Sequence, residues 1–258
     1  MIIDVNACLG HYPFRRLRHN SAAKMVAHMD RNGIDRALVS SLHAIFYRDT
    51  QSGDEEFFDE ISPHRERLIP IATVNPKYVG WERDLADSVV NVRVKAVALM
   101  PEYHGYALND SDGRGALAKI ASYGIPVVLR QRLEDRRQRH AWDRAEDMTP
   151  LALLAAARAH PNLKFLLVNW LGLDGEKLVE AGLKGRCLID FARLQIIYRK
   201  DALRLVETLG IEGLAFGSHM PFDYVGPSLV KLANFERLFP AELERIAWRN
   251  ASDFLGLA

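Results

Sequence analysis

The sequence predicts an α/β fold, a (β/α)₈ TIM barrel with an extra helix at its C-terminal end. Three observations support this prediction. The chain has 258 residues, close to the roughly 250 that eight strand–helix units need. Short apolar runs alternate strictly with longer segments of helical periodicity, which indicates a parallel sheet with right-handed crossovers. No linker or low-complexity tract divides the chain, so we expect residues 1–258 to form one barrel domain.

Each apolar run is almost continuous, as is typical of parallel strands that are covered on both faces. In chain order the predicted strands are Ile2–Ala7, Arg36–Ser40, Leu68–Thr73, Val94–Leu99, Pro126–Leu129, Lys164–Val168, Cys187–Asp190 and Gly213–Phe216. Eight strands favour closure into a barrel, and no glycine-rich phosphate-binding motif follows the first one, so an open doubly wound sheet is disfavoured.

Helical segments separate the strands, and local signals define several of their ends. The predicted helices are Ser21–Asn32, Glu55–Ile61, Trp81–Asn91, Asp112–Tyr123, Thr149–His160, Gly175–Leu183, Lys200–Leu209 and Ser228–Arg237, with Pro240–Leu255 as the additional terminal helix. The first of them ends at Gly33, a residue type that favours the helix C-cap. The fifth has proline in its first turn and stops before Pro161.

Overall charge favours neither a nucleic-acid nor a membrane partner. Lys and Arg number 34, Asp and Glu 33, and the formal net charge is +1. The longest apolar runs, such as Phe165–Val168, are far shorter than a membrane span. We therefore expect a small-molecule substrate as the partner, and the sequence leaves a homo-oligomer open.

Two further features bear on the compartment. The start Met1-Ile2-Ile3-Asp4 has no basic stretch before its apolar residues and no cleavage-site pattern, so it predicts a first strand instead of a signal peptide. Cys8 and Cys187 lie far apart and make no disulfide framework. A reducing cytoplasm is the expected location.

The longest irregular segment is Gln131–Asp147, after the fifth predicted strand. It mixes five arginines with five acidic residues: Arg132, Arg136, Arg137, Arg139 and Arg144, and Glu134, Asp135, Asp143, Glu146 and Asp147. Because the signs are mixed, we favour a solvated lid or a subunit contact over a loop that guides anions.

Polar and ionisable residues follow every predicted strand, where a barrel gathers its site around one mouth. They are Asn6, Cys8 and His11; His43; Asn75; Glu102 and His104; Arg130 and Gln131; Asn169 and Trp170; Asp190 and Arg193; and His219 and Asp223.

Several of these residues belong to segments that resemble a known family. Asp4-Val5-Asn6-Ala7-Cys8-Leu9-Gly10 resembles the opening "Asp-Val-His-x-His-x-Gly" of amidohydrolase-related proteins, in the branch of aminocarboxymuconate semialdehyde decarboxylase. Phe216-Gly217-Ser218-His219-Met220-Pro221 is similar to its "Phe-Gly-Ser-Asp-x-Pro", and Glu244–Leu255 to its closing "Glu-x-Ile…Asn-Ala-x-x-x-Leu" helix. Pro126–Arg130 and Val168–Gly172 stand where the family has its fifth- and sixth-strand histidines. The resemblance implies a TIM-barrel enzyme.

The positions that the resemblance assigns to metal ligands are all replaced. The family binds a divalent metal through four histidines and one aspartate, where this chain has Asn6, Cys8, Arg130, Asn169 and His219. Asn is a poor transition-metal ligand, and Arg cannot lose its proton to become one. We therefore expect no metal and no other cofactor. A rearranged metal site of Cys8, His11, His104 and His219 is the least favoured alternative.

The resemblance then implies an amidohydrolase-like hydrolase that acts on a small carboxylated lactone, ester or amide without a metal, since some relatives hydrolyse lactones in that way. Decarboxylation is the less favoured reaction. We assign Arg130 to anion or oxyanion binding, His219 to activation of water, and Asp223 to the orientation of His219. The predicted substrate-binding residues are Asn6, Asn169, Glu102, His104 and Trp170.

Structural roles compete with these assignments. Arg130 can pair structurally with Glu102, Asp190 or Asp223. His219 can be hydrogen-bonded in a filled pocket, and Asn6 and Asn169 can bond each other. For Cys8 a small buried residue is the favoured interpretation. The rival function is a non-catalytic barrel that binds a ligand or a partner subunit. An open mouth where Arg130 and His219 converge favours the enzyme, whereas a mouth plugged by Trp170, Tyr103 or Phe222 favours the rival.

Overall fold

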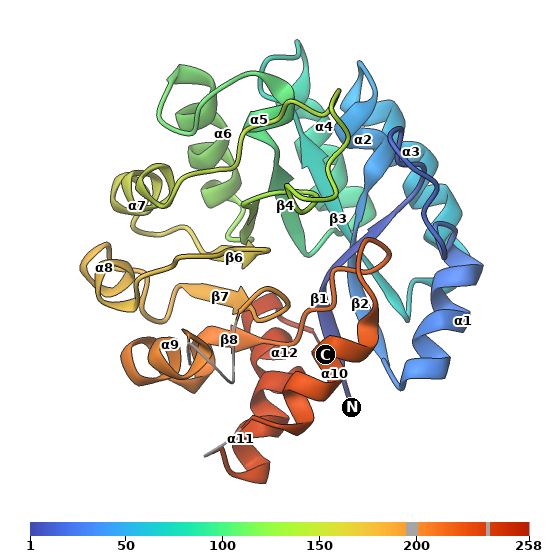
Figure 1. Cartoon of the computed structure of the whole chain (residues 1–258). Helices are drawn as coiled ribbons and strands as arrows, with labels where there is room; N and C mark the ends of the chain where they lie inside the picture. The colour runs from blue at the N-terminus through green and yellow to red at the C-terminus, as the bar shows by residue number, and fades with distance from the viewer. Residues whose placement is uncertain (195–200, 236–237, 258) are drawn as a thin grey trace.

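A computed structural model describes residues 1–194, 201–235 and 238–257, and its strands confirm the predicted TIM barrel (Figure 1). The eight strands are β1 Ile3–Leu9, β2 Arg36–Ser41, β3 Leu68–Val74, β4 Ala96–Leu99, β5 Val127–Arg130, β6 Phe165–Val168, β7 Cys187–Asp190 and β8 Leu214–Ala215. Each pairs in parallel with the next one along the chain.

The barrel closes where the last strand meets the first. The Val5 amide donates to the Phe216 carbonyl at 3.0 Å, and the Cys8 amide donates to the Met220 carbonyl at 2.9 Å. The register of β1 against β2 shifts between Asp4 and Ala7. Since β8 has only two residues, the segment after it is free to take an irregular path at this seam.

Helices surround the strands, as Figure 1 shows. They are α1 Ala22–Asn32, α3 Thr50–Ile61, α4 Trp81–Asp87, α6 Ser111–Ser122, α7 Pro150–Ala159, α8 Gly175–Glu180, α9 Asp201–Leu209 and α10 Val225–Ala233. Predicted helix residues Lys200, Glu236 and Arg237 lie outside the described residues. Two short helices at the strand ends were not predicted, α2 Leu42–Phe46 and α5 Pro101–His104. None of the helices in the described part of the chain is long and apolar enough to span a membrane.

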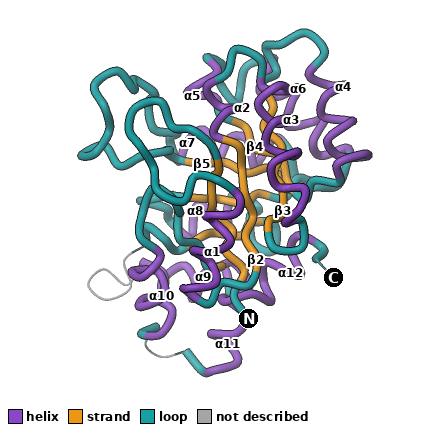
Figure 2. The backbone as a smooth tube through the Cα atoms, turned by 90° about the vertical axis from the view of Figure 1, so that its right-hand side faces the viewer, coloured by secondary structure: helices purple, strands orange, loops and turns teal. Residues whose placement is uncertain are grey.

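The predicted terminal helix is helical but not uniform. It consists of α11 Pro240–Glu244, a π-helical stretch Arg245–Arg249 and α12 Asn250–Leu255. Ala251 and Leu255 of α12 pack with inward-facing strand residues such as Val5 and Leu38. In Figure 2 α12 lies on the side of the molecule opposite the longest loops. The terminal helix therefore covers one end of the barrel, and the candidate site lies at the opposite end.

Alternation along each strand divides the core into two layers. Leu38 and Val128 belong to the inner cluster, whereas Val39 and Leu129 pack with the surrounding helices. This is the pattern of strands that are covered on both faces. The inner cluster is apolar up to the carboxyl ends of the strands, where the polar residues begin.

Candidate active site

Four buried polar side chains meet towards the carboxyl ends of the strands: one within β1, two at the last residues of β5 and β7, and one just after β6. They are Asn6, Arg130, Asn169 and Asp190, here named the central cluster. Asn6 Nδ2 donates to Asn169 Oδ1 at 2.8 Å and to Asp190 Oδ2 at 2.9 Å. Arg130 Nη1 donates to Asn6 Oδ1 at 2.6 Å. The structure thus brings together three of the five positions where the resemblance places metal ligands.

Arg130 is a buried cation whose donors are mostly uncommitted. A guanidinium has five N–H donors, and among the described residues its recorded hydrogen bond is the one to Asn6. The negative charge of Asp190 balances the positive charge of Arg130. The Asp190 carboxylate also accepts from the Asn169 amide at 2.8 Å. Burial raises the pKa of Asp190, while the hydrogen bonds from Asn6 and Asn169 and the charge of Arg130 oppose that shift. The remaining donors of Arg130 are available to an anionic ligand.

The segment after β8 has each of its residues fixed by a specific contact. A Cβ atom on Gly217 would lie 2.5 Å from Asp190 Oδ2, so only glycine fits there. The Ser218 hydroxyl hydrogen-bonds to the Asp4 carboxylate, which also accepts from the Ser218 amide at 3.0 Å. Burial raises the pKa of Asp4 to about 7. Together these contacts hold His219, whose φ is +62°, at the seam of the barrel.

His219 and Asp223 form a hydrogen-bonded dyad. His219 is fully buried, and its Nδ1 lies 2.9 Å from Asp223 Oδ2, while its Nε2 has no hydrogen-bond partner among the described residues. A carboxylate accepts only, so Nδ1 carries the proton and Nε2 keeps its lone pair. The dyad therefore presents a free acceptor inside the protein.

Electrostatics keep this imidazole neutral and its partner ionised. Burial lowers the pKa of His219 to about 4, with the charges of Arg130 and Arg193 adding to the effect. Burial alone would raise the pKa of Asp223, but its hydrogen bond with His219 and the charge of Arg193 outweigh it, and that pKa lies below its ordinary value. Arg193 Nη2 reaches Asp223 at 3.1 Å, and its Nη1 reaches Asp135 at 3.2 Å.

An aromatic cover closes the site from the loop side. It consists of Tyr12, Phe14, Phe46, Tyr103 and Phe222. The Phe222 ring stacks on His219 with ring centroids 5.0 Å apart, and Tyr12 meets Phe222 edge-on at 4.9 Å. Arg130 is 4% exposed and His219 0%, so water does not reach them freely. The mouth is thus plugged in this structure. Two of the plugging residues, Tyr103 and Phe222, are among the three that we named for the rival function.

The charged segment after β5 lies against this cover with most of its charges paired. Arg132 and Arg139 reach Asp147 at 2.8 Å and 3.0 Å. Buried Glu134 accepts from the Tyr12 hydroxyl at 2.9 Å, and Asp143 accepts from the Tyr103 hydroxyl at 3.0 Å. These pairings fit the predicted solvated lid or subunit contact better than an anion-guiding loop.

The other predicted substrate-binding residues lie apart from the central cluster. Trp170 is fully buried in the outer core layer, where its indole N–H donates to the Leu129 carbonyl at 2.8 Å. Glu102 and His104 sit in α5; the His104 ring lies 3.3 Å from the Ile45 carbonyl, and burial lowers its pKa to about 4. Burial raises the pKa of Glu102 to about 7. Within the described residues no contact joins these three to Arg130 or His219.

The residues at the family's ligand positions do not fit a divalent metal. In the described part of the chain no group of three or more His, Cys, Asp or Glu side chains could hold a metal ion. Cys8 is buried, with its Sγ 3.4 Å from the Ser40 hydroxyl, as the structural interpretation predicted. Arg130 adds a positive charge where the cation would sit.

The sequence did not assign Asp190, Arg193 or Ser218 to the site. Asp190 is the last residue of β7 and Arg193 follows that strand, so the sequence indicated them by position alone. Ser218 stands beside His219 in the motif that carries the resemblance. The missing information was the pairing, because Asp190 and Arg193 act through contacts with residues far away in the chain.

Comparisons with known proteins agree on the fold. No protein-family model and no curated sequence matches the chain. The solved 5-carboxyvanillate decarboxylase from Sphingomonas paucimobilis is 13% identical, with TM-score 0.74 over 100% of this chain and 99% of its own. A dihydroxybenzoic acid decarboxylase from Polaromonas, solved with manganese and an inhibitor, is 13% identical, with TM-score 0.74 over 99% and 97%.

A hydrolase is also similar. The probable 2-pyrone-4,6-dicarboxylic acid hydrolase from Acinetobacter baumannii, solved with citric acid, is 14% identical, with TM-score 0.70 over 99% of each chain. These neighbours are TIM barrels of the amidohydrolase superfamily, so the predicted resemblance is confirmed at the level of the fold. Their names carry no activity over to this chain at such low identity.

Proposed function

We propose that the chain is a hydrolase of the amidohydrolase fold that acts, without a metal, on a small carboxylated lactone, ester or amide. One observation carries the proposal: His219 is fully buried, Asp223 holds its Nδ1, and its Nε2 has no partner among the described residues. A buried acceptor is costly unless something uses it. A neutral imidazole oriented by a carboxylate is the arrangement of a general base.

Arg130 supplies the complementary group. Its charge is close enough to His219 to lower the pKa of the imidazole, and most of its donors are uncommitted among the described residues. A guanidinium can hold a substrate carboxylate in two hydrogen bonds or stabilise a developing oxyanion. The structural neighbours are named as enzymes of carboxylated rings, which is compatible with this substrate class, although most of them are decarboxylases and only one of those named above is a hydrolase.

The chemistry then follows from these two side chains. His219 Nε2 takes a proton from water as the water oxygen bonds to the carbonyl carbon, and Arg130 stabilises the resulting oxyanion. When the bond to the leaving oxygen or nitrogen breaks, Nε2 returns the proton to it. Asn6 orients Arg130 and does not itself react. Phe222 and Tyr12 must part for a substrate to reach the dyad, because they cover it.

The test is turnover of carboxylated lactones and aryl esters at neutral pH by wild type and by His219→Gln. We expect the variant to lose about 10²- to 10⁴-fold in rate, the usual worth of a general base. Arg158→Gln is the control, because Arg158 is exposed on α7. Elemental analysis of protein purified without chelator accompanies the assay. Stoichiometric metal, or equal rates for wild type and His219→Gln, would contradict the proposal.

A second candidate is a non-catalytic ligand-binding or partner subunit, and the aromatic cover favours it. The hydrogen bonds of Asn6 with Asn169 and Asp190 also favour it, since side chains that satisfy one another need no ligand. The panel also includes carboxylated phenols, with release of CO₂ as the readout. If no compound of the panel is turned over, the non-catalytic subunit replaces the hydrolase as the favoured function.

A further inference from the structure

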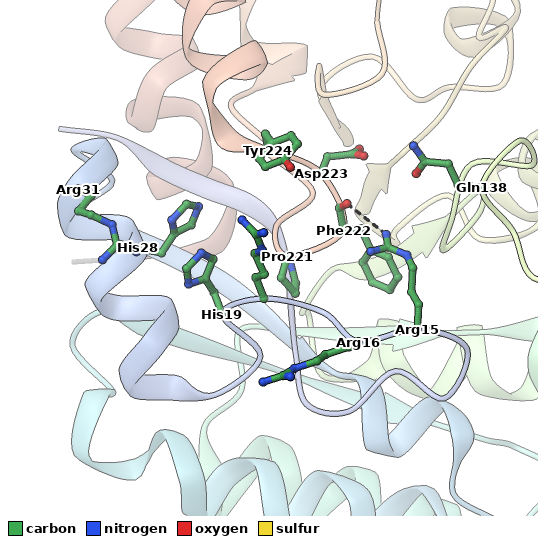
Figure 3. A pocket seen from close by; sticks show the side chains of 11 residues that line it. Arg15, Arg16, His19, His28, Arg31, Gln138, Pro221, Phe222, Asp223 and Tyr224 are labelled. Atoms are coloured by element: carbon green, nitrogen blue, oxygen red, sulfur yellow. Dashed lines mark hydrogen bonds between the residues drawn. The ribbon is translucent and has the colours of Figure 1, made fainter.

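A second feature lies outside the aromatic cover, between the loop after β1, helix α1 and the loop after β8. Eleven residues line a groove of about 790 Å³: Arg15, Arg16, Arg18, His19, His28, Arg31, Gln138, Pro221, Phe222, Asp223 and Tyr224. Figure 3 shows their side chains around a common space. We call this space the basic groove. Its volume lies in the range of small-molecule sites, roughly 300–1,000 Å³.

Positive charge dominates the basic groove. Four of its residues are arginines, and its single acidic residue, Asp223, is already engaged by Arg193 and His219. Arg15 pairs with Glu134 at 2.5 Å, but for Arg16, Arg18 and Arg31 no ion pair is recorded among the described residues. Unpaired guanidiniums gathered in a hollow raise the local concentration of anions. The chain as a whole carries only +1, so the excess is local.

The loop that carries these arginines is held in place. Leu17 is buried with Cys8 and Tyr12, so its neighbours Arg16 and Arg18 stay at the surface. The Gly10 amide donates to the Asn20 carbonyl at 3.0 Å and closes the loop onto β1. A fixed loop loses less entropy when a ligand binds, which favours a site over a flexible basic tail.

Two histidines add donors to the same wall. His19 and His28 stack with ring centroids 4.1 Å apart and planes 7° apart, which joins the loop to α1. Burial lowers the pKa of both imidazoles, and the neighbouring charge of Arg31 lowers it further. The charges of Arg18 and Lys24 also lower the pKa of His19. An anion placed against this pair would offset those charges and favour protonation of the rings.

We propose that the basic groove binds a small molecule with at least two anionic groups, phosphates or carboxylates, at a site separate from the central cluster. Phe222 lies between the groove and the dyad, because its ring lines the groove and also stacks on buried His219. Asp223 borders both, since it lines the groove and contacts His219 Nδ1. A small ligand fits better than nucleic acid, since the cations gather around this groove and one neighbouring hollow, which Arg16, Arg18, Arg31 and Lys24 line, while the net charge of the whole chain is only +1.

The experiment is isothermal titration calorimetry with pyrophosphate and with citrate at matched ionic strength, which distinguishes phosphate from carboxylate ligands. Wild type is compared with the double variant Arg18→Gln/Arg31→Gln and with Arg158→Gln, an exposed arginine on α7. Each groove arginine is expected to contribute about fivefold in affinity, so the double variant should bind about 25-fold more weakly. Arg158→Gln should bind as wild type does.

Two further readouts keep the outcome separate from catalysis. His219→Gln should retain the binding, because His219 does not line the groove. Titrations in two buffers of different ionisation enthalpy should reveal proton uptake with wild type and less with His28→Gln. No binding in the millimolar range, equal affinity of the double variant and wild type, or tighter binding of single-stranded nucleic acid than of pyrophosphate overturns the proposal.

Discussion

Arg130 and the arginines of the basic groove differ in how the protein compensates their charge. Arg130 is 4% exposed, donates to Asn6 and is balanced by buried Asp190. Arg16, Arg18 and Arg31 are exposed, with no ion pair recorded among the described residues. A buried cation must be held by its surroundings, whereas an exposed one is stabilised by water and costs little. The charge of Arg130 is thus tied to the stability of the fold, whereas the exposed groove arginines can bind an external anion without that constraint.

Removal of the buried cation should produce the largest change in stability. Arg130→Met leaves Asn6 Oδ1 without its donor and Asp190 without its opposite charge. We expect a loss of about 3–5 kcal/mol in the free energy of unfolding, as for other broken buried pairs. Urea denaturation at pH 7 measures it, with Arg158→Met as the surface control that should stay within about 0.5 kcal/mol. If Arg130→Met is as stable as Arg158→Met, the buried interactions of Arg130 with Asn6 and Asp190 do not stabilise the fold.

The next effect concerns the pH dependence of stability. The pKa of His219 is about 4 in the folded protein, against about 6.5 in an unfolded chain. As pH falls from 6.5 towards 4, the unfolded chain binds a proton that the folded protein does not, so this contribution to stability is full above pH 6.5 and is lost on acidification.

Comparison with His219→Gln isolates that contribution from other groups. The difference in unfolding free energy, wild type minus variant, should fall by about 3 kcal/mol between pH 7 and pH 4. Denaturant unfolding at a series of pH values measures it. Burial raises the pKa of Asp4 and Glu102, but these groups contribute to both proteins and cancel. Asp223 does not cancel, because its hydrogen bond with His219 lowers its pKa, and its part of the difference belongs to the acid end of the series. A difference that does not change with pH would show that the imidazole is not held neutral.

A smaller loss is expected at Gly217. A Cβ atom there would lie 2.5 Å from Asp190 Oδ2 and 2.7 Å from Asp190 Cβ. Gly217→Ala should therefore displace Asp190 and cost about 1–3 kcal/mol, the usual cost of overpacking. Gly115→Ala is the matched control, because nothing lies within 4 Å of its added Cβ inside α6 and alanine favours helices. Gly115→Ala should stabilise the protein. Equal losses in the free energy of unfolding for both variants would contradict the close contact at Gly217.

The sequence predicted the barrel well because its signals are local. Each apolar run overlaps one strand, and for Cys187–Asp190 the predicted and observed bounds are the same. Strand ends in a barrel meet at one mouth. This rule brought Asn6, Arg130 and Asn169 together correctly. Helices α2 and α5 were missed because four or five residues are too few to display a helical period.

Side-chain direction and distant pairing could not be predicted. Asn169 has φ +61°, and the chain turns so that Trp170 packs in the outer layer and not at the mouth. The aromatic cover joins Tyr12, Phe46, Tyr103 and Phe222 from four separate loops and short helices. No sequence period relates such positions, because the contacts arise only when the barrel has closed.

The smallest effect is expected in the basic groove. Arg18 lies near Arg31 and the other groove arginines, with no ion pair recorded in the described part of the chain, so it adds repulsion to the folded state. Arg18→Gln should leave stability unchanged or raise it by about 0.3–0.5 kcal/mol at low salt, and salt should remove the gain by screening. Urea denaturation at low and at high salt measures this. A loss comparable with that of Arg130→Met would mean that Arg18 is compensated inside the fold, and the contrast between the two regions would fail; a salt-sensitive gain leaves Arg18 free for an anion.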